Sequence, residues 1–302
     1  MRWGIEQRIE FIEFRLFWEG SINRADLIDF FGVSVPQASK DLALYQERAP
    51  GNMEYDNRSK RYVAADKFVL RFLNPDPYVY LAQLRSVAEG TAAPHESWIA
   101  RLPEADVALT PKRGIDIEVL RRVLDAVRGG NSVEVLYQSM NRQRPDPIWR
   151  RITPHAFGYD GFRWHARSYC HLEHKFKDFL LPRILDVRSK GKPVATGESD
   201  WLWNNYFDII IGPHPDLTES QQAVVEKDYG MSNGNAVLPV RYAMLFYVLK
   251  RLGLLGDAEK EDARRQHIVA LNKDDVQNAL NKANNLQDIG EVKVSSGSRG
   301  NL

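Results

Sequence analysis

The most informative stretch of the chain is 152-ITPHAFGYDGFRWHARSYCHLEHKFKDFLLPRI-184. It alternates as two β-strands do on either side of the turn Asp160-Gly161, but histidine and arginine stand where a sheet usually carries apolar groups. These residues line either a solvated face of the sheet or a pocket for an anion. A solvated face would carry lysine and glutamate as readily, whereas Arg forks match phosphates and imidazole can donate hydrogen bonds. The composition therefore favours an anion pocket.

The register of this hairpin has two alternatives. A two-residue Asp160-Gly161 loop would pair Tyr159 with Phe162 and put His155 opposite Ala166. A three-residue loop with a bulge at Gly161 would pair Gly158 with Phe162 and bring His155 level with His165. The alternation of side chains does not distinguish them.

Length and composition predict an ordinary globular protein of two or three domains, with 302 residues, 43% of them hydrophobic and 27% charged. The apolar runs are too short for a membrane span, and the N-terminus carries no secretory signal pattern. A single cysteine, Cys170, excludes an internal disulfide framework and fits a cytoplasmic protein. The net charge of +1 requires any nucleic-acid binding to use a local patch or a dimer.

The first 65 residues have the element order of a winged helix-turn-helix. Apolar residues recur at helical spacing from Trp3 to Trp18. Asn23 can cap a second helix that ends at Gly32, and Ser34 can cap a third, 35-VPQASKDLALYQER-48. Two β-type runs follow around a polar turn in 53-MEYDNRSKRYVAA-65. This order, helix, helix-turn-helix and β-hairpin, indicates a DNA-binding domain at residues 1–65.

The third helix would enter the major groove with its N-terminal residues, while the hairpin follows the flanking backbone or minor groove. Gln can pair with adenine, and Lys and Arg supply charge for phosphates. The alternative is a small three-helix domain used for protein contacts. The predicted DNA-contacting residues are Ser34, Gln37, Ser39, Lys40, Arg58, Lys60 and Arg61.

Three further segments complete the chain. Residues 66–114 read as a helical connector with a helix near 78–90. Residues 115–192 read as one helix followed by short strands, which suggests a small bent sheet or partial barrel. Residues 193–302 hold the helix 241-RYAMLFYVLKRLGLL-255, whose circumference is more than half apolar, so it should be buried in its own domain or against a second subunit. A Gly/Ser-rich tail from 286 is predicted to be disordered at its end. The predicted strands are 132–139, 148–159, 162–170 and 175–184.

No catalytic set, metal site or cofactor motif emerges. The segment 165-HARSYCHLEH-174 contains zinc-ligand residue types but no CxxC pair and no HExxH. Cys170 fits a small buried residue at a strand end. There is no nucleophile elbow, P-loop or dinucleotide glycine turn. We therefore predict a protein that is not an enzyme and needs no cofactor or metal.

These features together resemble a WYL-domain transcriptional regulator. The resemblance lies in the winged helix, the strand 132-SVEVLYQS-139, the segment 152-ITPHAFGYDGFRWHARSY-169 and the closing 179-FLLPRI-184. The family is named after the triplet Trp-Tyr-Leu. Trp164-His165-Ala166 occupies this position here, so two of the three residues differ. The three-block order over roughly residues 1–285 most resembles the repressors beside phage-defence operons, of the CapW/BrxR type.

The resemblance implies an α+β protein with a winged helix-turn-helix, a central Sm-like β-barrel and a C-terminal α/β dimerisation domain. A homodimer would repress transcription from an operator in double-stranded DNA, an inverted repeat, until an anionic nucleotide or nucleic-acid-derived effector binds the central domain. The alternative is a nucleic-acid-binding regulatory subunit of a partner enzyme. The implied ligand-binding residues are Tyr137, Ser139, His155, His165, Arg167, Phe179 and Arg183.

Overall fold

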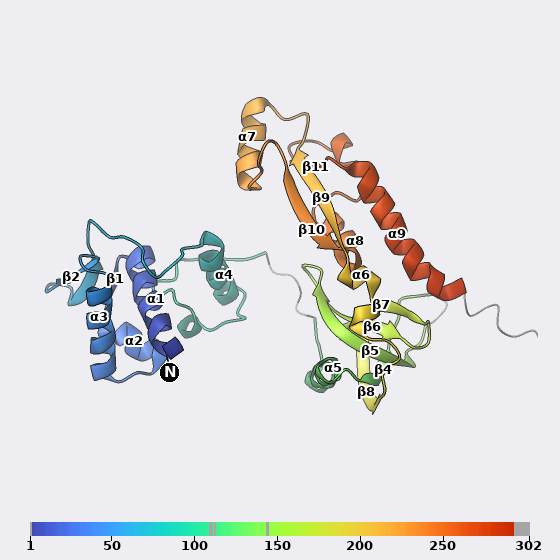
Figure 1. Ribbon diagram of the computed structural model, residues 1–302, viewed down its shortest axis with the longest axis horizontal. Helices are drawn as coiled ribbons and strands as arrows, with labels where there is room; N and C mark the ends of the chain where they lie inside the picture. The colour runs from blue at the N-terminus through green and yellow to red at the C-terminus, as the bar shows by residue number, and fades with distance from the viewer. Residues whose placement is uncertain (1, 109–110, 112, 143–144, 293–302) are drawn as a thin grey trace, which may run out of the picture. The chain divides into compact units, whose positions relative to one another are not determined.

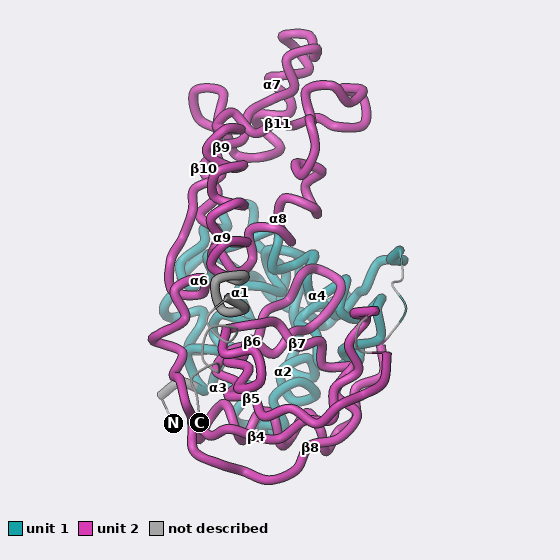
Figure 2. The backbone as a smooth tube through the Cα atoms, turned by 90° about the vertical axis from the view of Figure 1, so that its right-hand side faces the viewer, with its two compact units in different colours: residues 1–111 teal, residues 112–302 magenta. Residues whose placement is uncertain are grey.

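A computed structural model describes residues 2–108, 111, 113–142 and 145–292. The chain forms two compact units, residues 1–111 and 112–302, coloured separately in Figure 2. The mixed helix and strand content agrees with the predicted α+β class. Each unit is described by itself.

The N-terminal unit begins with three helices, α1 (Arg2–Glu19), α2 (Arg24–Phe31) and α3 (Val35–Arg48). The predicted caps are confirmed. The Asn23 side chain accepts from the backbone N–H of Asp26, and Ser34 accepts from that of Gln37. Gly32 ends α2 with φ of 63°, a left-handed conformation that glycine adopts without a steric penalty. Figure 1 shows α2 and α3 beside α1.

A three-stranded sheet completes the winged helix. The predicted hairpin is formed by β2 (Met53–Asp56) and β3 (Arg61–Ala64), which pair from Met53 opposite Ala64 to Asp56 opposite Arg61. A third strand, β1 (Ser21–Ile22), pairs with β3 and was not predicted, because two residues show no alternation.

The connector is anchored to α1 by a buried carboxylate. Glu13 is 0% exposed, and its two oxygens accept from the backbone N–H groups of Arg71, Phe72 and Leu73. They also accept from the hydroxyl of Tyr45 at 3.0 Å. A carboxylate can be buried at acceptable cost when its lone pairs are filled in this way. The helix expected at 78–90 is α4 (Pro77–Ala88).

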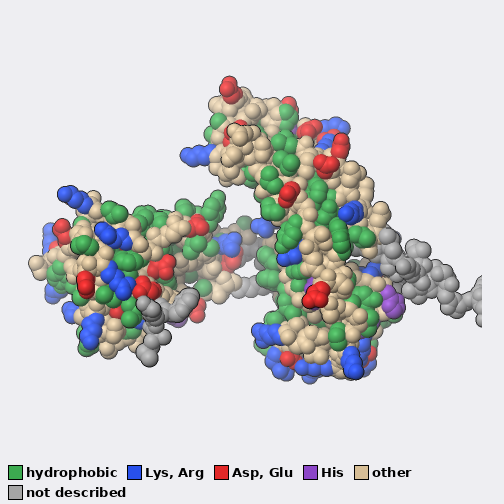
Figure 3. All heavy atoms as spheres, viewed as in Figure 1, with side chains coloured by type: hydrophobic (Ala, Val, Ile, Leu, Met, Phe, Trp, Pro, Cys, Tyr) green, Lys and Arg blue, Asp and Glu red, His purple; other side chains and the backbone are tan. Residues whose placement is uncertain are grey.

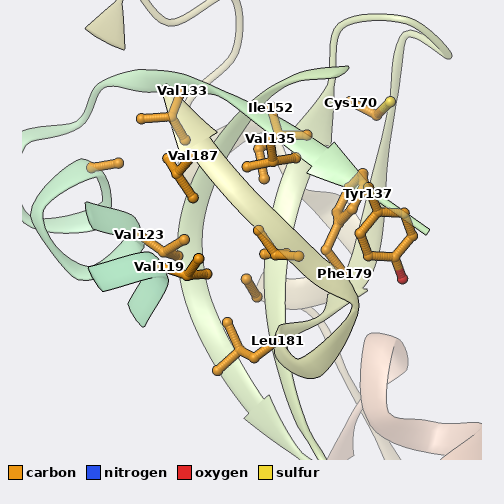
Figure 4. Packing of buried hydrophobic residues seen from close by; sticks show 13 residues of the cluster. Val119, Val123, Val133, Val135, Tyr137, Ile152, Cys170, Phe179, Leu181 and Val187 are labelled. Atoms are coloured by element: carbon orange, nitrogen blue, oxygen red, sulfur yellow. The ribbon is translucent and has the colours of Figure 1, made fainter. Parts of the chain in front are cut away.

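The C-terminal unit begins with α5 (Ile117–Gly129), which covers a five-stranded antiparallel sheet in the order β7-β6-β5-β4-β8. Apolar side chains of α5 and of the strands form one core, which Figure 4 shows with Tyr137 beside Phe179. In the described residues β7 and β8 are edge strands, so the sheet is open rather than the closed Sm-like barrel that was expected. The strands are β4 (Ser132–Tyr137), β5 (Ile148–Tyr159), β6 (Trp164–Cys170), β7 (Lys175–Leu180) and β8 (Ile184–Gly191).

The predicted strand at 175–184 is too long. The strand β7 ends at Leu180, and a 3-10 turn, η2 (Leu181–Arg183), turns the chain into β8. Pro182 at the second position of η2 has a fixed φ and no N–H to donate to a ladder, which favours the turn over a continuing strand. β8 was missed because its outward positions are mostly charged.

Both predicted registers of the β5–β6 hairpin are wrong. Tyr159 pairs with Trp164 and Gly158 with His165, so the loop runs from Asp160 to Arg163. The Asp160 carboxylate fixes this loop, since Oδ1 accepts from the backbone N–H groups of Phe162 (2.8 Å) and Arg163 (2.6 Å). The ladder also shifts between Pro154 and Ala156, which leaves His155 at a bulge without a cross-strand partner.

The last block is a three-stranded antiparallel sheet, order β10-β9-β11, with helices packed on it (Figure 1). The helix expected at 241–255 is shorter and buried on one side only, because Leu245 and Leu249 are 0% exposed and Phe246 is 50% exposed. The elements are α6 (Trp201–Asn204), β9 (Tyr206–Pro213), α7 (Glu219–Asp228), β10 (Ala236–Arg241), α8 (Leu245–Arg251), β11 (Ile268–Ala270) and α9 (Lys273–Val292).

The helix α9 was not predicted, and it extends over residues 286–292, where the sequence predicted the start of a tail. Its apolar residues Val276, Ala279 and Ala283 are buried, but small residues among Asn, Asp and Lys give a weak periodic signal. The remainder of the predicted tail, 293–302, lies outside the described residues.

Candidate functional site

Four of the seven predicted DNA-contacting residues are held by contacts inside the N-terminal unit. Ser34 caps α3, and the Ser39 hydroxyl donates to the carbonyl of Val35 at 3.0 Å. The Gln37 amide donates to Asp41 at 2.9 Å. Arg61 donates to Asp26 at 2.8 Å and to the Ser21 hydroxyl. Arg61 therefore ties the wing to α2 and β1.

The other three residues, Lys40 on α3 and Arg58 and Lys60 at the wing turn, are exposed. Within the described residues none of the three forms an ion pair. Asp56 shapes the wing turn by accepting from the backbone N–H of Arg58 at 2.9 Å. Figure 3 shows Lys and Arg side chains interspersed with acidic ones on the visible face of this unit. The helix α3 and the wing thus present three cationic side chains to solvent.

Sequence reasoning missed a groove between the start of α2 and the wing. It has a volume of about 380 Å³. Tyr55 and Tyr62 are cross-strand neighbours with ring centroids 5.1 Å apart, and Tyr55 is 47% exposed. Tyr55 and Tyr62 stand opposite each other in the hairpin that the sequence predicted, and this pairing could have indicated the groove. The lining residues are Asn23, Arg24, Ala25, Tyr55, Lys60 and Tyr62.

The His/Arg cluster of the central sheet is centred on Arg167. Its guanidinium donates from Nε to Asp200 Oδ2 at 2.7 Å and from Nη2 to Oδ1 at 3.1 Å. Nη1 lies 3.3 Å from Asp178. His155 Nε2 lies 3.0 Å from the same Asp200 carboxylate. Arg167 is 0% and Asp200 1% exposed, so this is a buried and neutralised pair.

Hydrogen bonds and burial act in opposite directions on the Asp200 carboxyl. Burial alone would raise the pKa of the Asp200 carboxyl, but the hydrogen bonds from His155 and Arg167 outweigh it and hold that pKa below its usual value. Asp178 also accepts from the hydroxyl of Tyr247 at 3.2 Å. Burial, with the nearby charge of Asp178, raises the pKa of Tyr247. Tyr247 is therefore a hydrogen-bond donor throughout the physiological range.

His165 lies on the same side of the sheet as Arg167, two residues away on β6. Its Nε2 lies 3.0 Å from Asp160 and its ring is 5.0 Å from that of Tyr247. Nδ1 is buried without a hydrogen-bond partner in the described structure. Burial opposes ionisation of Asp160, but hydrogen bonds from His165 and Arg163 prevail and lower its pKa. His165 is 3% and Arg167 0% exposed, so these two side chains do not lie on a solvated face, whereas His174 of the same segment is exposed.

The remaining implied ligand residues lie on the other face or at the strand ends. Tyr137 and Phe179 are in the core, with ring centroids 4.9 Å apart, and the Tyr137 hydroxyl accepts from the backbone N–H of Leu180. Ser139, half-buried, follows β4 and accepts from the backbone N–H of Asn141. Arg183 lies in η2, where its carbonyl accepts from Gln138. The structure therefore brings His155, His165 and Arg167 together, whereas Tyr137 and Phe179 lie in the core on the other face of the sheet.

Other chemistries find no support in these contacts. Cys170 is buried at the end of β6, as predicted, and His171 is bonded to the Thr153 hydroxyl. No cluster of three or more metal-ligating side chains occurs in the described part of the chain. Among the helices described, none has the length and apolarity needed to cross a bilayer.

Three family models match consecutive parts of the chain. The BrxR transcriptional regulator winged helix-turn-helix domain matches residues 4–86, the WYL domain residues 118–189, and the BrxR C-terminal dimerization domain residues 206–276. Among solved structures, the proteasome accessory factor B/C (PafBC) of Arthrobacter aurescens aligns over 92% of this chain and 46% of its own, with 16% identity and a TM-score of 0.29. That score is too low to support a structural comparison.

Curated relatives match nearly the whole chain. A DNA-binding transcriptional repressor CapW of Stenotrophomonas maltophilia is 40% identical over 278 residues, 91% of this chain and 92% of the relative. One of Pseudomonas aeruginosa with the same name is 36% identical over 281 residues, 92% and 93% of the two chains. The three domain matches occur in the order that the fold displays. The chain therefore belongs to the CapW/BrxR-type family of WYL-domain transcriptional regulators, which are not enzymes.

Proposed function

We propose that this protein is a DNA-binding transcriptional repressor that acts as a homodimer on an inverted repeat and is released by an anionic nucleotide or nucleic-acid-derived effector. The regulated genes would form a phage-defence-type operon. The observation that carries the proposal is a set of three exposed cations on the recognition helix and wing of a winged helix-turn-helix, which form no ion pair in the part of the chain that the structure describes: Lys40, Arg58 and Lys60. Phosphate contacts of this kind supply most of the affinity for DNA.

The hydrogen-bond partners of the seven predicted contact residues within the protein indicate which of them would bind phosphates and which would read bases. Lys40, Arg58 and Lys60 can reach phosphates without breaking a contact, whereas Arg61 would first have to leave Asp26. Ser34 caps α3, the helix that would read base edges, and Gln37 and Ser39 lie on it. Gln37 can release Asp41 because Arg8 also holds that carboxylate at 2.6 Å. Arg24 and Tyr55, which line the groove, would extend this contact surface toward the DNA backbone.

Operator binding by single variants tests this assignment. Lys40→Ala and Arg58→Ala are each expected to weaken binding and to reduce the slope of log K against log salt by about 1, since each removes one phosphate contact. Arg61→Ala is expected to lower stability instead, because it removes the link to Asp26. Gel shifts at several salt concentrations and thermal unfolding measure the two effects. Equal salt slopes for wild type and the first two variants would contradict the assignment.

We place the homodimer interface on the open face of the sheet formed by β9, β10 and β11. One face of this sheet carries Ile209 and Ile211 and is covered by helices. On the other face Ile210 pairs with Val237, which is 52% exposed, and Tyr206 is 54% exposed. A sheet face that exposes Val237 and Tyr206, beside the charged Asp208 and Arg241, lies within the C-terminal dimerization-domain match and fits a second copy of this chain.

The whole proposal is tested with the DNA upstream of the gene for this protein. The full chain is expected to shift that DNA and to protect two half-sites about 34 Å apart or a multiple of it, as a two-fold symmetric dimer requires. Footprints without an inverted repeat would exclude the proposed operator. Absence of any specific shift would favour the alternative, a regulatory subunit that modulates a partner enzyme.

A further inference from the structure

The carboxylate of Asp200 holds Arg167 as a phosphoryl group would. Two parallel N–H···O contacts, 2.7 and 3.1 Å long, join the Nε and Nη2 atoms of the guanidinium to the two oxygens of the carboxylate. This fork geometry is the one by which arginine recognises both carboxylates and phosphates. His155 adds a ring nitrogen 3.0 Å from the same carboxylate. Asp200 therefore fills the position where an anion bound by Arg167 and His155 would lie.

Asp200 also begins α6, the short helix between the central sheet and the C-terminal block. Its Oδ1 accepts from the backbone N–H of Trp203 at 3.2 Å, and its carbonyl accepts from the N–H of Asn204 at 3.0 Å. Leu202 of α6 packs with Ala243 and Ala283 of the C-terminal block. One buried side chain thus contacts both the anion-recognising groups and the element that leads into β9.

We propose that Asp200 is an internal placeholder in the effector site, which a phosphoryl group of the effector displaces from Arg167. The proposal rests on the effector sensing proposed above and specifies how it is regulated. The Nε/Nη2 edge of the guanidinium, which Asp200 occupies, accommodates one bidentate partner at a time, so the phosphoryl group and Asp200 compete for that edge. Displacement removes the side-chain cap of α6 and leaves its first turn held by backbone hydrogen bonds alone. Through α6 it changes the start of β9 in the dimer block.

Binding of inorganic pyrophosphate to the full chain without DNA tests the competition. Asp200→Asn is expected to bind pyrophosphate at least about tenfold more tightly than wild type, because a neutral amide is a weaker competitor, while asparagine still caps α6. The matched control is Asp178→Asn, which removes the same charge from the other partner of Arg167 but does not fill the fork. It is expected to change the affinity by less than about threefold. Isothermal titration calorimetry measures the pyrophosphate affinity of the wild type and of both variants.

Equal affinities for wild type and Asp200→Asn would overturn the proposal, and so would an equal gain in both variants, which would indicate only a general charge effect. Should Asp200→Asn fail to fold, hydrogen exchange of the wild type decides the question. Saturating pyrophosphate is expected to accelerate exchange of the Trp203 and Asn204 amides, and unchanged or slower exchange would overturn displacement. Gel shifts report operator binding separately, so failure of the placeholder is distinguishable from failure of the repressor function.

Discussion

Val237→Asp in the full chain is expected to produce a monomer and to weaken operator binding by roughly 10²–10⁴-fold, the factor that linkage of two half-sites typically contributes. The substitution places a charge on the open sheet face, where an opposing apolar surface would have to bury it. The side chain is 52% exposed in the single chain, so folding itself should change little. Sedimentation equilibrium and gel shifts measure the two effects.

The matched control is Val194→Asp, at a position 66% exposed and outside the dimerization-domain match. It is expected to remain a dimer with wild-type operator affinity. A dimeric Val237→Asp protein that binds its operator normally would exclude this face as the interface. Deletion of the whole block from Pro193 is a poorer test, because it removes Asp200 and leaves the buried Arg167 without its bidentate partner.

Glu13→Ala is expected to lower the free energy of unfolding of the N-terminal unit by roughly 3–5 kcal/mol, because several donors lose their acceptor at once. Three backbone N–H groups of the connector and the Tyr45 hydroxyl bond to this carboxylate. Burial raises the pKa of Tyr45, so its hydroxyl stays a donor that needs an acceptor. Native-state hydrogen exchange of the full chain, read at the amides of the N-terminal unit, measures the loss.

The control on the same helix is Glu6→Ala, which removes a surface ion pair to Arg48 and is expected to cost at most about 1 kcal/mol. A Glu13→Ala protein as stable as the Glu6→Ala protein would show that the connector does not depend on the buried carboxylate. Protease cleavage within residues 66–76 offers a second readout, because release of the connector should expose its backbone.

Much of the fold could be predicted from local sequence. Asn23 and Ser34 cap the helices α2 and α3 as predicted, and β5 has the predicted bounds, because capping chemistry and strand alternation act over a few residues. The elements that were missed lack such local signals. β1 has two residues, β8 is largely charged outside its core positions, and α9 buries mainly small side chains.

The family, the winged helix-turn-helix and the His/Arg cluster of the central sheet are predictable from the chain alone, since they depend on residue types and on their spacings. The hydrogen-bond partners of that cluster depend on the three-dimensional fold. Asp200, 33 residues from Arg167, neutralises it, and the Asp160 side chain sets a hairpin register that alternation left open. The charge and hydrogen bonding of a buried group depend on what the fold brings within about 3 Å of it, and long-range neighbours have no signature in local sequence.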